Sequence, residues 1–179
     1  MAVGSLAVFC GSHDGNNPSY ASAAIELGTL MAKHQVKLIY GGGKVGIMGK
    51  VADAVMAAGG TVTGVIPKVL LAWEKYHKDI TELIVAEDMH SRKKMLYSLC
   101  DAAIVLPGGH GTLDELFEML TWNQLSIHDK QIFILNTAGF YDHLVAHIRK
   151  MYEEGLLYED PAKRIFVLEK PEDLVAYLG

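Results

Sequence analysis

Short apolar runs rich in β-branched residues alternate with longer stretches of helical periodicity along the whole chain. Several short runs are apolar at every position, as strands of a parallel sheet covered on both faces require. The pattern predicts strands at Leu6–Phe9, Lys37–Tyr40, Thr61–Ile66, Leu83–Ala86, Ala102–Leu106, Gln131–Leu135 and Arg164–Leu168. It predicts helices at Pro18–His34, Ile47–Ala58, Ser91–Ser98, Thr112–Leu125, Tyr141–Glu154 and Pro171–Leu178.

This alternation predicts an α/β fold, a doubly wound, Rossmann-like parallel sheet of about seven strands flanked by helices. No linker, repeat or low-complexity segment divides the chain, so we expect a single domain over residues 1–179. The segment Pro67–Thr81 has no clear element and is long enough to be a functional loop.

Three glycine-bearing segments follow predicted strands. They are Cys10-Gly11-Ser12, Gly41-Gly42-Gly43 and Pro107-Gly108-Gly109, after the first, second and fifth strands. The carboxyl ends of parallel strands meet at one edge of the sheet, where such folds bind ligands. We therefore expect the three segments to converge on one ligand site.

The segment Pro107–Glu115 combines a strand end, three glycines and a predicted helix start near Thr112. Glycines let backbone N–H groups approach an anion, and a helix start adds free donors and a positive dipole end. Thr112 is expected to cap the helix or to donate its hydroxyl to phosphate. The structural alternative is a tight turn with Thr112 as the cap and Asp114 and Glu115 as ordinary first-turn acids.

The segment Gly41–Gly49 contains a formal match to the dinucleotide fingerprint at Gly41, Gly43 and Gly46. No acidic residue follows the next predicted strand, where that fingerprint needs one, so the match is weak evidence for a nicotinamide site. In Asp88–Met95, cations crowd the start of a predicted helix, and the guanidinium of Arg92 is suited to anion recognition.

Composition and charge limit the kinds of partner that we expect the protein to bind. The net charge of −5 gives no general attraction to nucleic acid or to an anionic membrane. No run approaches the roughly 18 apolar residues that span a bilayer, and Cys10 and Cys100 are expected to be buried free thiols of a reducing compartment. We expect a soluble cytoplasmic protein. His143 and His147 share a helix face without a matching third ligand, so no metal site is predicted.

The motifs together resemble those of the LONELY GUY (LOG) family, the cytokinin riboside 5′-monophosphate phosphoribohydrolases, which are often labelled lysine decarboxylases. The resemblance rests on Gly41-Gly-Gly-Lys-Val-Gly-Ile-Met-Gly49, Met89-His-Ser-Arg-Lys93, Pro107-Gly-Gly-His-Gly-Thr-Leu-Asp-Glu115 and Thr121–Lys130. It covers nearly the whole chain. The combination of the PGGxGTxxE pattern with the upstream arginine is specific, whereas neither glycine segment alone would be.

The resemblance implies that Arg92 and Glu115 are the catalytic pair of an N-glycosidase acting on purine ribonucleoside 5′-monophosphates such as AMP. It implies no cofactor and a homodimer, to which Met95, Leu96 and Leu99 contribute unless they belong to the core. His110, and Leu71-Ala72-Trp73 before Glu74, depart from the residues expected in plant members, which leaves the preferred base open. The candidate substrate-binding residues are Gly11, Ser12, Gly42, Gly43, Met48, Glu74, Lys93, Pro107, Gly108, Gly109, His110, Gly111, Thr112 and Thr121.

The chemistry agrees with this assignment. Breaking an N-glycosidic bond builds positive charge on the sugar, which a carboxylate at Glu115 can stabilise while it orients the attacking water. Arg92 is expected to keep Glu115 ionised and aimed, or to contact the sugar phosphate. The alternatives are a non-catalytic nucleotide-binding or carrier protein, a nicotinamide oxidoreductase and, least favoured, a pyridoxal-dependent decarboxylase.

Overall fold

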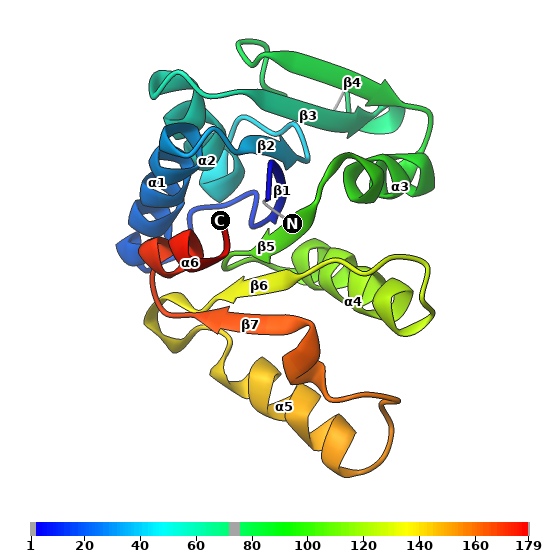
Figure 1. The fold of residues 1–179 in the computed structure, drawn as a ribbon. Coiled ribbons are helices and arrows are strands. Elements are labelled where there is room, and N and C mark those ends of the chain that lie inside the picture. The colour runs from blue at the N-terminus through cyan, green and yellow to red at the C-terminus, as the bar shows by residue number, and fades with distance from the viewer. Residues whose placement is uncertain (1–2, 72–75, 179) are drawn as a thin grey trace.

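The computed structural model describes residues 3–71 and 76–178, which form one seven-stranded parallel sheet with helices on both faces (Figure 1). The strand order is β4-β3-β2-β1-β5-β6-β7. The strands are β1 Ser5–Phe9, β2 Lys37–Tyr40, β3 Val62–Pro67, β4 Glu82–Ala86, β5 Ala102–Val105, β6 Ile132–Leu135 and β7 Ile165–Leu168. The α-helices are α1 Pro18–Lys33, α2 Gly46–Ala57, α3 Met89–Leu99, α4 His110–Gln124, α5 Asp142–Glu153 and α6 Val175–Leu178. The predicted doubly wound fold is confirmed.

The helices divide between the two faces of the sheet (Figure 1). Helices α1, α2 and α6 cover one face, where Leu6 and Val8 of β1 enter the core. Helices α3, α4 and α5 cover the other face, where the alternate residues Ala7 and Phe9 are buried. Because successive side chains of a strand point to opposite faces, a strand buried on both must be apolar throughout.

The winding reverses between β1 and β5, which pair in parallel with Phe9 opposite Val105. The chain leaves β1 toward α1 on one face and leaves β5 toward α4 on the other, so the two loops separate and open a crevice. The amide of Gly11 donates to the carbonyl of Pro107 across it, at 3.0 Å, and the Met48 amide donates to the Gly11 carbonyl at 3.2 Å. The first and third glycine segments meet as expected, whereas Gly41, Gly42 and Gly43 do not line the cavity and the second segment approaches it only through Met48 and Arg92.

Helices α3 and α4 each begin two residues before the predicted start, and both differences affect the site. Helix α3 begins at Met89, because the Asp88 carboxylate accepts from the Ser91 amide at 2.7 Å and caps the helix there. Helix α4 begins at His110 rather than near Thr112, and its cap position is Gly109, whose backbone is extended. The prediction of Thr112 as the helix cap is therefore wrong. At the C-terminus, the predicted helix consists of a 3₁₀ turn, Pro171–Leu174, followed by the short α6.

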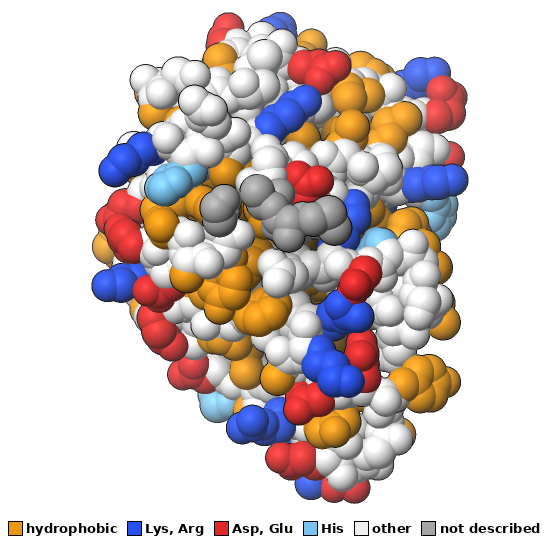
Figure 2. Space-filling view, in the orientation of Figure 1, with side chains coloured by type: hydrophobic (Ala, Val, Ile, Leu, Met, Phe, Trp, Pro, Cys, Tyr) orange, Lys and Arg blue, Asp and Glu red, His pale blue; other side chains and the backbone are white. Residues whose placement is uncertain are grey.

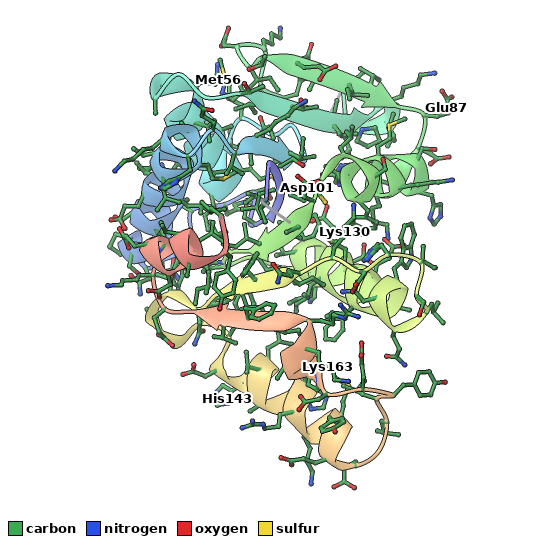
Figure 3. All side chains as sticks on the ribbon, in the orientation of Figure 1. Met56, Glu87, Asp101, Lys130, His143 and Lys163 are labelled. Carbon is green, nitrogen blue, oxygen red and sulfur yellow. The ribbon has the colours of Figure 1, made fainter. Side chains whose placement is uncertain are left out.

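The side chains predicted to lie on the surface differ in how far they are exposed. Leu96 lies in the core, whereas Leu99 is 38% exposed. The histidines of α5, of which His143 is labelled in Figure 3, are both exposed. Acidic and basic side chains intermingle on the face that Figure 2 shows. Within residues 3–71 and 76–178, no helix is long and apolar enough to cross a bilayer.

Candidate active site

A cavity of about 400 Å³ opens at the carboxyl ends of the strands, beside the crevice between β1 and β5. Its walls come from the loop after β1, from α2, from α3 and from the start of α4. It brings together most of the residues predicted to act on the substrate, namely Gly11, Ser12, Met48, Arg92, Lys93, Gly109, His110, Gly111, Thr112 and Glu115.

The start of α4 supplies backbone donors to this cavity. The first hydrogen bond of the helix runs from the Leu113 amide to the Gly109 carbonyl, at 3.2 Å. The amides of residues 110 to 112 precede it and have no acceptor within the helix. The preceding turn requires a glycine at position 108, because a Cβ there would lie 2.1 Å from the Thr112 hydroxyl. The result is a compact anion-binding turn at the positive end of a helix dipole.

The Arg92 side chain extends from α3 to the cavity and on its way contacts β3 and the glycine segment that follows β2. Its Nε donates to the Val65 carbonyl of β3 at 3.1 Å, and its Nη1 lies 3.7 Å from Oε1 of Glu115. A Cβ on Gly41 would stand only 2.2 Å from the second guanidinium nitrogen. The glycine after β2 therefore makes room for the arginine. Both members of the Arg92–Glu115 pair have only 12% of the side chain exposed.

Glu115 lies in the second turn of α4 and faces Arg92. Burial raises the pKa of Glu115 to about 7, Arg92 and Lys93 lower it, and the neighbouring carboxylates Asp114 and Glu118 raise it. The expectation that Arg92 keeps this carboxyl ionised is only partly met, because desolvation outweighs the attraction of the guanidinium. Glu115 is instead balanced between its two protonation states near neutral pH.

This balance has a consequence for stability. The folded state holds the Glu115 proton up to about pH 7, whereas the unfolded carboxyl loses it near 4.5. The free energy of unfolding should therefore fall as the pH rises between these values, by on the order of 3 kcal/mol in total. Glu115→Gln, which cannot ionise, is expected to melt at higher temperature than wild type at pH 8 but not at pH 4.5. Scanning calorimetry at both values checks this, and an equal difference at both would contradict it.

The structure places the other predicted residues elsewhere. Pro107 and Gly108 line an adjoining cavity of about 290 Å³ that shares Gly11, Ser12 and Gly109 with the first. Gly42 and Gly43 are buried behind the site, where the Gly42 carbonyl accepts from the His77 amide at 2.8 Å. Glu74, predicted to bind the substrate, lies outside the described residues.

Thr121, also predicted to bind the substrate, lies apart from the Arg92–Glu115 pair. It is exposed on α4, its hydroxyl donates to the Phe117 carbonyl at 2.7 Å, and it lines a different groove of about 240 Å³. That groove runs between α4 and the segment around Pro161. Within one chain, Thr121 does not border the cavity that holds Glu115.

The sequence interpretation did not identify every residue that shapes the cavity. Cys10 lines it, and burial together with the charge of Glu115 raises the pKa of its thiol. Asp114 and Glu118 bind Lys93 at 3.1 and 2.9 Å. Their spacing of four residues on one predicted helix, opposite a lysine, was the available signal. No cluster of three metal-ligating side chains occurs in the part of the chain that the structure describes.

The fold and the cavity define an open α/β protein with an anion-binding turn and a buried arginine–glutamate pair at the point where its winding reverses. A family model described as "possible lysine decarboxylase" matches residues 48–178. Cytokinin riboside 5′-monophosphate phosphoribohydrolase LOG1 of Arabidopsis thaliana is 45% identical over 93% of this chain and 77% of its own. The probable enzyme LOG6 of the same plant is 45% identical over 93% of this chain and 82% of its own. The chain therefore belongs to the LOG family.

The fold also occurs in proteins with other roles. The solved structure of the molybdenum cofactor carrier protein of Chlamydomonas reinhardtii matches 96% of this chain and 93% of its own, with a TM-score of 0.73 and 20% identity. At that identity the two proteins share the fold, and function has to be argued from the site.

Proposed function

We propose that this protein hydrolyses the N-glycosidic bond of purine ribonucleoside 5′-monophosphates, releasing the free base and ribose 5-phosphate. One observation carries the proposal: Glu115 and the free amides of residues 110 to 112 border the same cavity, on one helix. About 4.5 Å of helical rise separates residue 112 from residue 115. A ligand phosphate on those amides therefore has its sugar near the carboxylate. The homology to phosphoribohydrolases supports the same reaction.

The reaction follows from this placement. The bond between C1′ and the base nitrogen breaks, water oxygen bonds to C1′, and one proton of that water ends on the base. Positive charge grows on the ribose as the bond lengthens. The Glu115 carboxylate stabilises this charge and orients the water, while phosphate binding removes the entropy cost of bringing sugar and carboxylate together.

Arg92 has two roles in this proposal. Its Nε is anchored on the Val65 carbonyl, so the remaining nitrogens face Glu115 and the cavity. The guanidinium stabilises the ionised form of Glu115, the form that the reaction requires, against the cost of burial. It also presents donors to the sugar phosphate. Neither role needs a cofactor or a metal ion.

A substrate panel tests the reaction itself. Chromatography of base release from AMP, ADP, ATP and adenosine should show release from the monophosphate, with kcat/KM for adenosine lower by at least about 100-fold because the phosphate contacts are missing. N6-substituted adenosine monophosphates belong in the same panel. His110, at the first position of α4, lines the cavity and is our candidate for the residue that selects the base. The N6-substituted substrates test whether this protein acts on the cytokinin ribosides that the names of its relatives give. Release of no base from any monophosphate would refute the proposal.

We also propose that the protein is a homodimer in which Thr121 serves the partner's site. Thr121 matches a substrate-binding position of the family, yet it lies outside the cavity of its own chain. Phe117 and Leu125 stand one helical turn before and after it, and both, like Ile127 just beyond, are exposed apolar side chains. Light scattering should give the mass of a dimer at micromolar concentration. Phe117→Glu together with Leu125→Glu should yield a monomer with reduced activity, and an active monomer would contradict this proposal.

The partners and location follow from the same residues. The substrate is a small nucleoside monophosphate, and the net charge of −5 disfavours nucleic acid or an anionic membrane as a partner. Cys10 and Cys100 are buried free thiols, as suits the reducing cytoplasm. The second candidate function, a non-catalytic nucleotide carrier, would use the anion-binding turn at the start of α4 and would not need Glu115.

A further inference from the structure

A second cluster of charged side chains lies next to the Arg92–Glu115 pair. The Lys93 ammonium contacts Asp114 Oδ2 at 3.1 Å and Glu118 Oε2 at 2.9 Å. The Tyr97 hydroxyl donates to the same Oε2 of Glu118, at 2.7 Å. These contacts join α3 to α4 next to the site, because Lys93 follows Arg92 in α3 and Asp114 precedes Glu115 in α4.

Tyr97 is the fixed end of this network. It is 1% exposed, and its ring packs edge-on against Phe9 of β1 and Trp122 of α4, with centroids 6.0 and 5.1 Å away. Its backbone carbonyl accepts from the ammonium of Lys130, which reaches α3 from the loop before β6 and is labelled in Figure 3. Burial, and then the hydrogen bond to Glu118, raises the pKa of Tyr97, so its hydroxyl remains a donor.

The two carboxylates occupy N–H donors of Lys93 that could otherwise bind a substrate. A lysine ammonium has three N–H groups, and Asp114 and Glu118 take two of them. Only one remains for a ligand in the cavity that Lys93 lines. With its side chain 12% exposed, Lys93 has no room to turn freely, so the two carboxylates fix the direction of that donor.

The same carboxylates act on Glu115. The charged and titratable groups around it are Arg92, Lys93 and Tyr97 on α3, Asp114 and Glu118 on α4, and Cys10 after β1. Three carboxylates against two cations leave an excess negative charge when all are ionised. Glu118 therefore opposes the ionisation of Glu115, even though its ion pair holds the Lys93 cation of α3 close to α4.

We infer that Glu118, anchored by Tyr97, is a positioning residue that holds Lys93 toward the substrate phosphate and sets the charge balance around Glu115. It acts through Lys93 and Glu115 and touches no reacting atom. This inference rests on the catalytic role proposed for Glu115.

Two substitutions separate the two parts of this role. Glu118→Gln keeps an oxygen acceptor for Tyr97 and Lys93 but removes a negative charge near Glu115. The kcat/KM of wild type should rise through pH 7 as Glu115 ionises. In the variant this rise should occur at lower pH, with the plateau of kcat within about threefold of wild type.

Tyr97→Phe keeps every charge and removes only the anchoring hydroxyl. The rise of kcat/KM with pH should stay at the pH of wild type, while kcat/KM for AMP falls about tenfold, mainly through a higher KM.

The controls identify which claim fails. Glu153→Gln removes an exposed carboxylate at the end of α5 and should leave the pH profile unchanged. If Glu115→Gln loses turnover but Glu118→Gln and Tyr97→Phe give wild-type profiles and KM values, only the inference about Glu118 is overturned. A lower melting temperature with an unchanged profile and KM likewise means that the network is only structural. If Glu115→Gln keeps full turnover, the proposed function itself fails.

Discussion

Replacing Glu115 by glutamine is expected to lower kcat for AMP by at least about 100-fold while leaving AMP binding nearly unchanged. The amide keeps the volume and one oxygen of the carboxyl group but carries no charge to stabilise the developing cation on ribose. The phosphate contacts come from the backbone at the start of α4, which the substitution does not alter. Base release measured by chromatography, with the dissociation constant from calorimetry, checks both halves of this expectation.

The matched control is again Glu153→Gln, which removes a carboxylate of the same kind far from the cavity and should keep wild-type kcat. The comparison also decides between the two candidate functions. A carrier needs the phosphate turn but not the acid, so unchanged turnover in Glu115→Gln would contradict the catalytic assignment. Loss of binding together with turnover would mean that Glu115 holds the ground state rather than the transition state.

The second large effect is expected from Gly41→Ala, a substitution at a residue behind the arginine. The new Cβ would lie 2.2 Å from the Arg92 guanidinium, so the flexible end of that side chain has to move away. Because this end is displaced rather than any backbone, we expect the fold to survive and the melting temperature to change little. The kcat/KM for AMP should fall between about 10- and 100-fold, as removal of a preorganised cation does.

A double substitution shows whether this loss passes through Arg92. Arg92→Ala should lose at least as much activity, and Gly41→Ala combined with Arg92→Ala should be no worse than Arg92→Ala alone. Additive losses would mean that Gly41 matters for another reason. Gly4→Ala is the control, since its Cβ would meet its nearest atom at an ordinary 3.4 Å.

The sequence predicted the fold because its signals are local and agree with one another. The apolar runs are as long as the strands, and the glycines mark their carboxyl ends, so topology rules left few arrangements. The pairing of Arg92 with the Pro107–Glu115 segment came from the family resemblance. Its geometry could not be read from the sequence, because α3 lies in the crossover from the edge strand β4 to β5 and α4 follows β5, so only the strand order brings the two helices together.

Two features of the site depend on tertiary structure alone. The start of α4 was misplaced by two residues because a threonine after glycine is a typical cap, whereas here residue 112 lies inside the helix and packs against Gly108. The protonation of Glu115 depends on how deeply its carboxyl is buried, which a sequence does not show even where it shows a neighbouring arginine. The network of Tyr97, Lys93 and Glu118 likewise exists only once α3 and α4 pack together.

The most direct test of the central claim is the crystal structure of Glu115→Gln with AMP bound. We expect the phosphate to accept hydrogen bonds from the amides of residues 110 to 112, with C1′ of the ribose facing the side chain at position 115. Arg92 should lie within hydrogen-bonding distance of the ligand or of that side chain. AMP bound with its phosphate away from the start of α4, or with its ribose remote from position 115, would contradict the account.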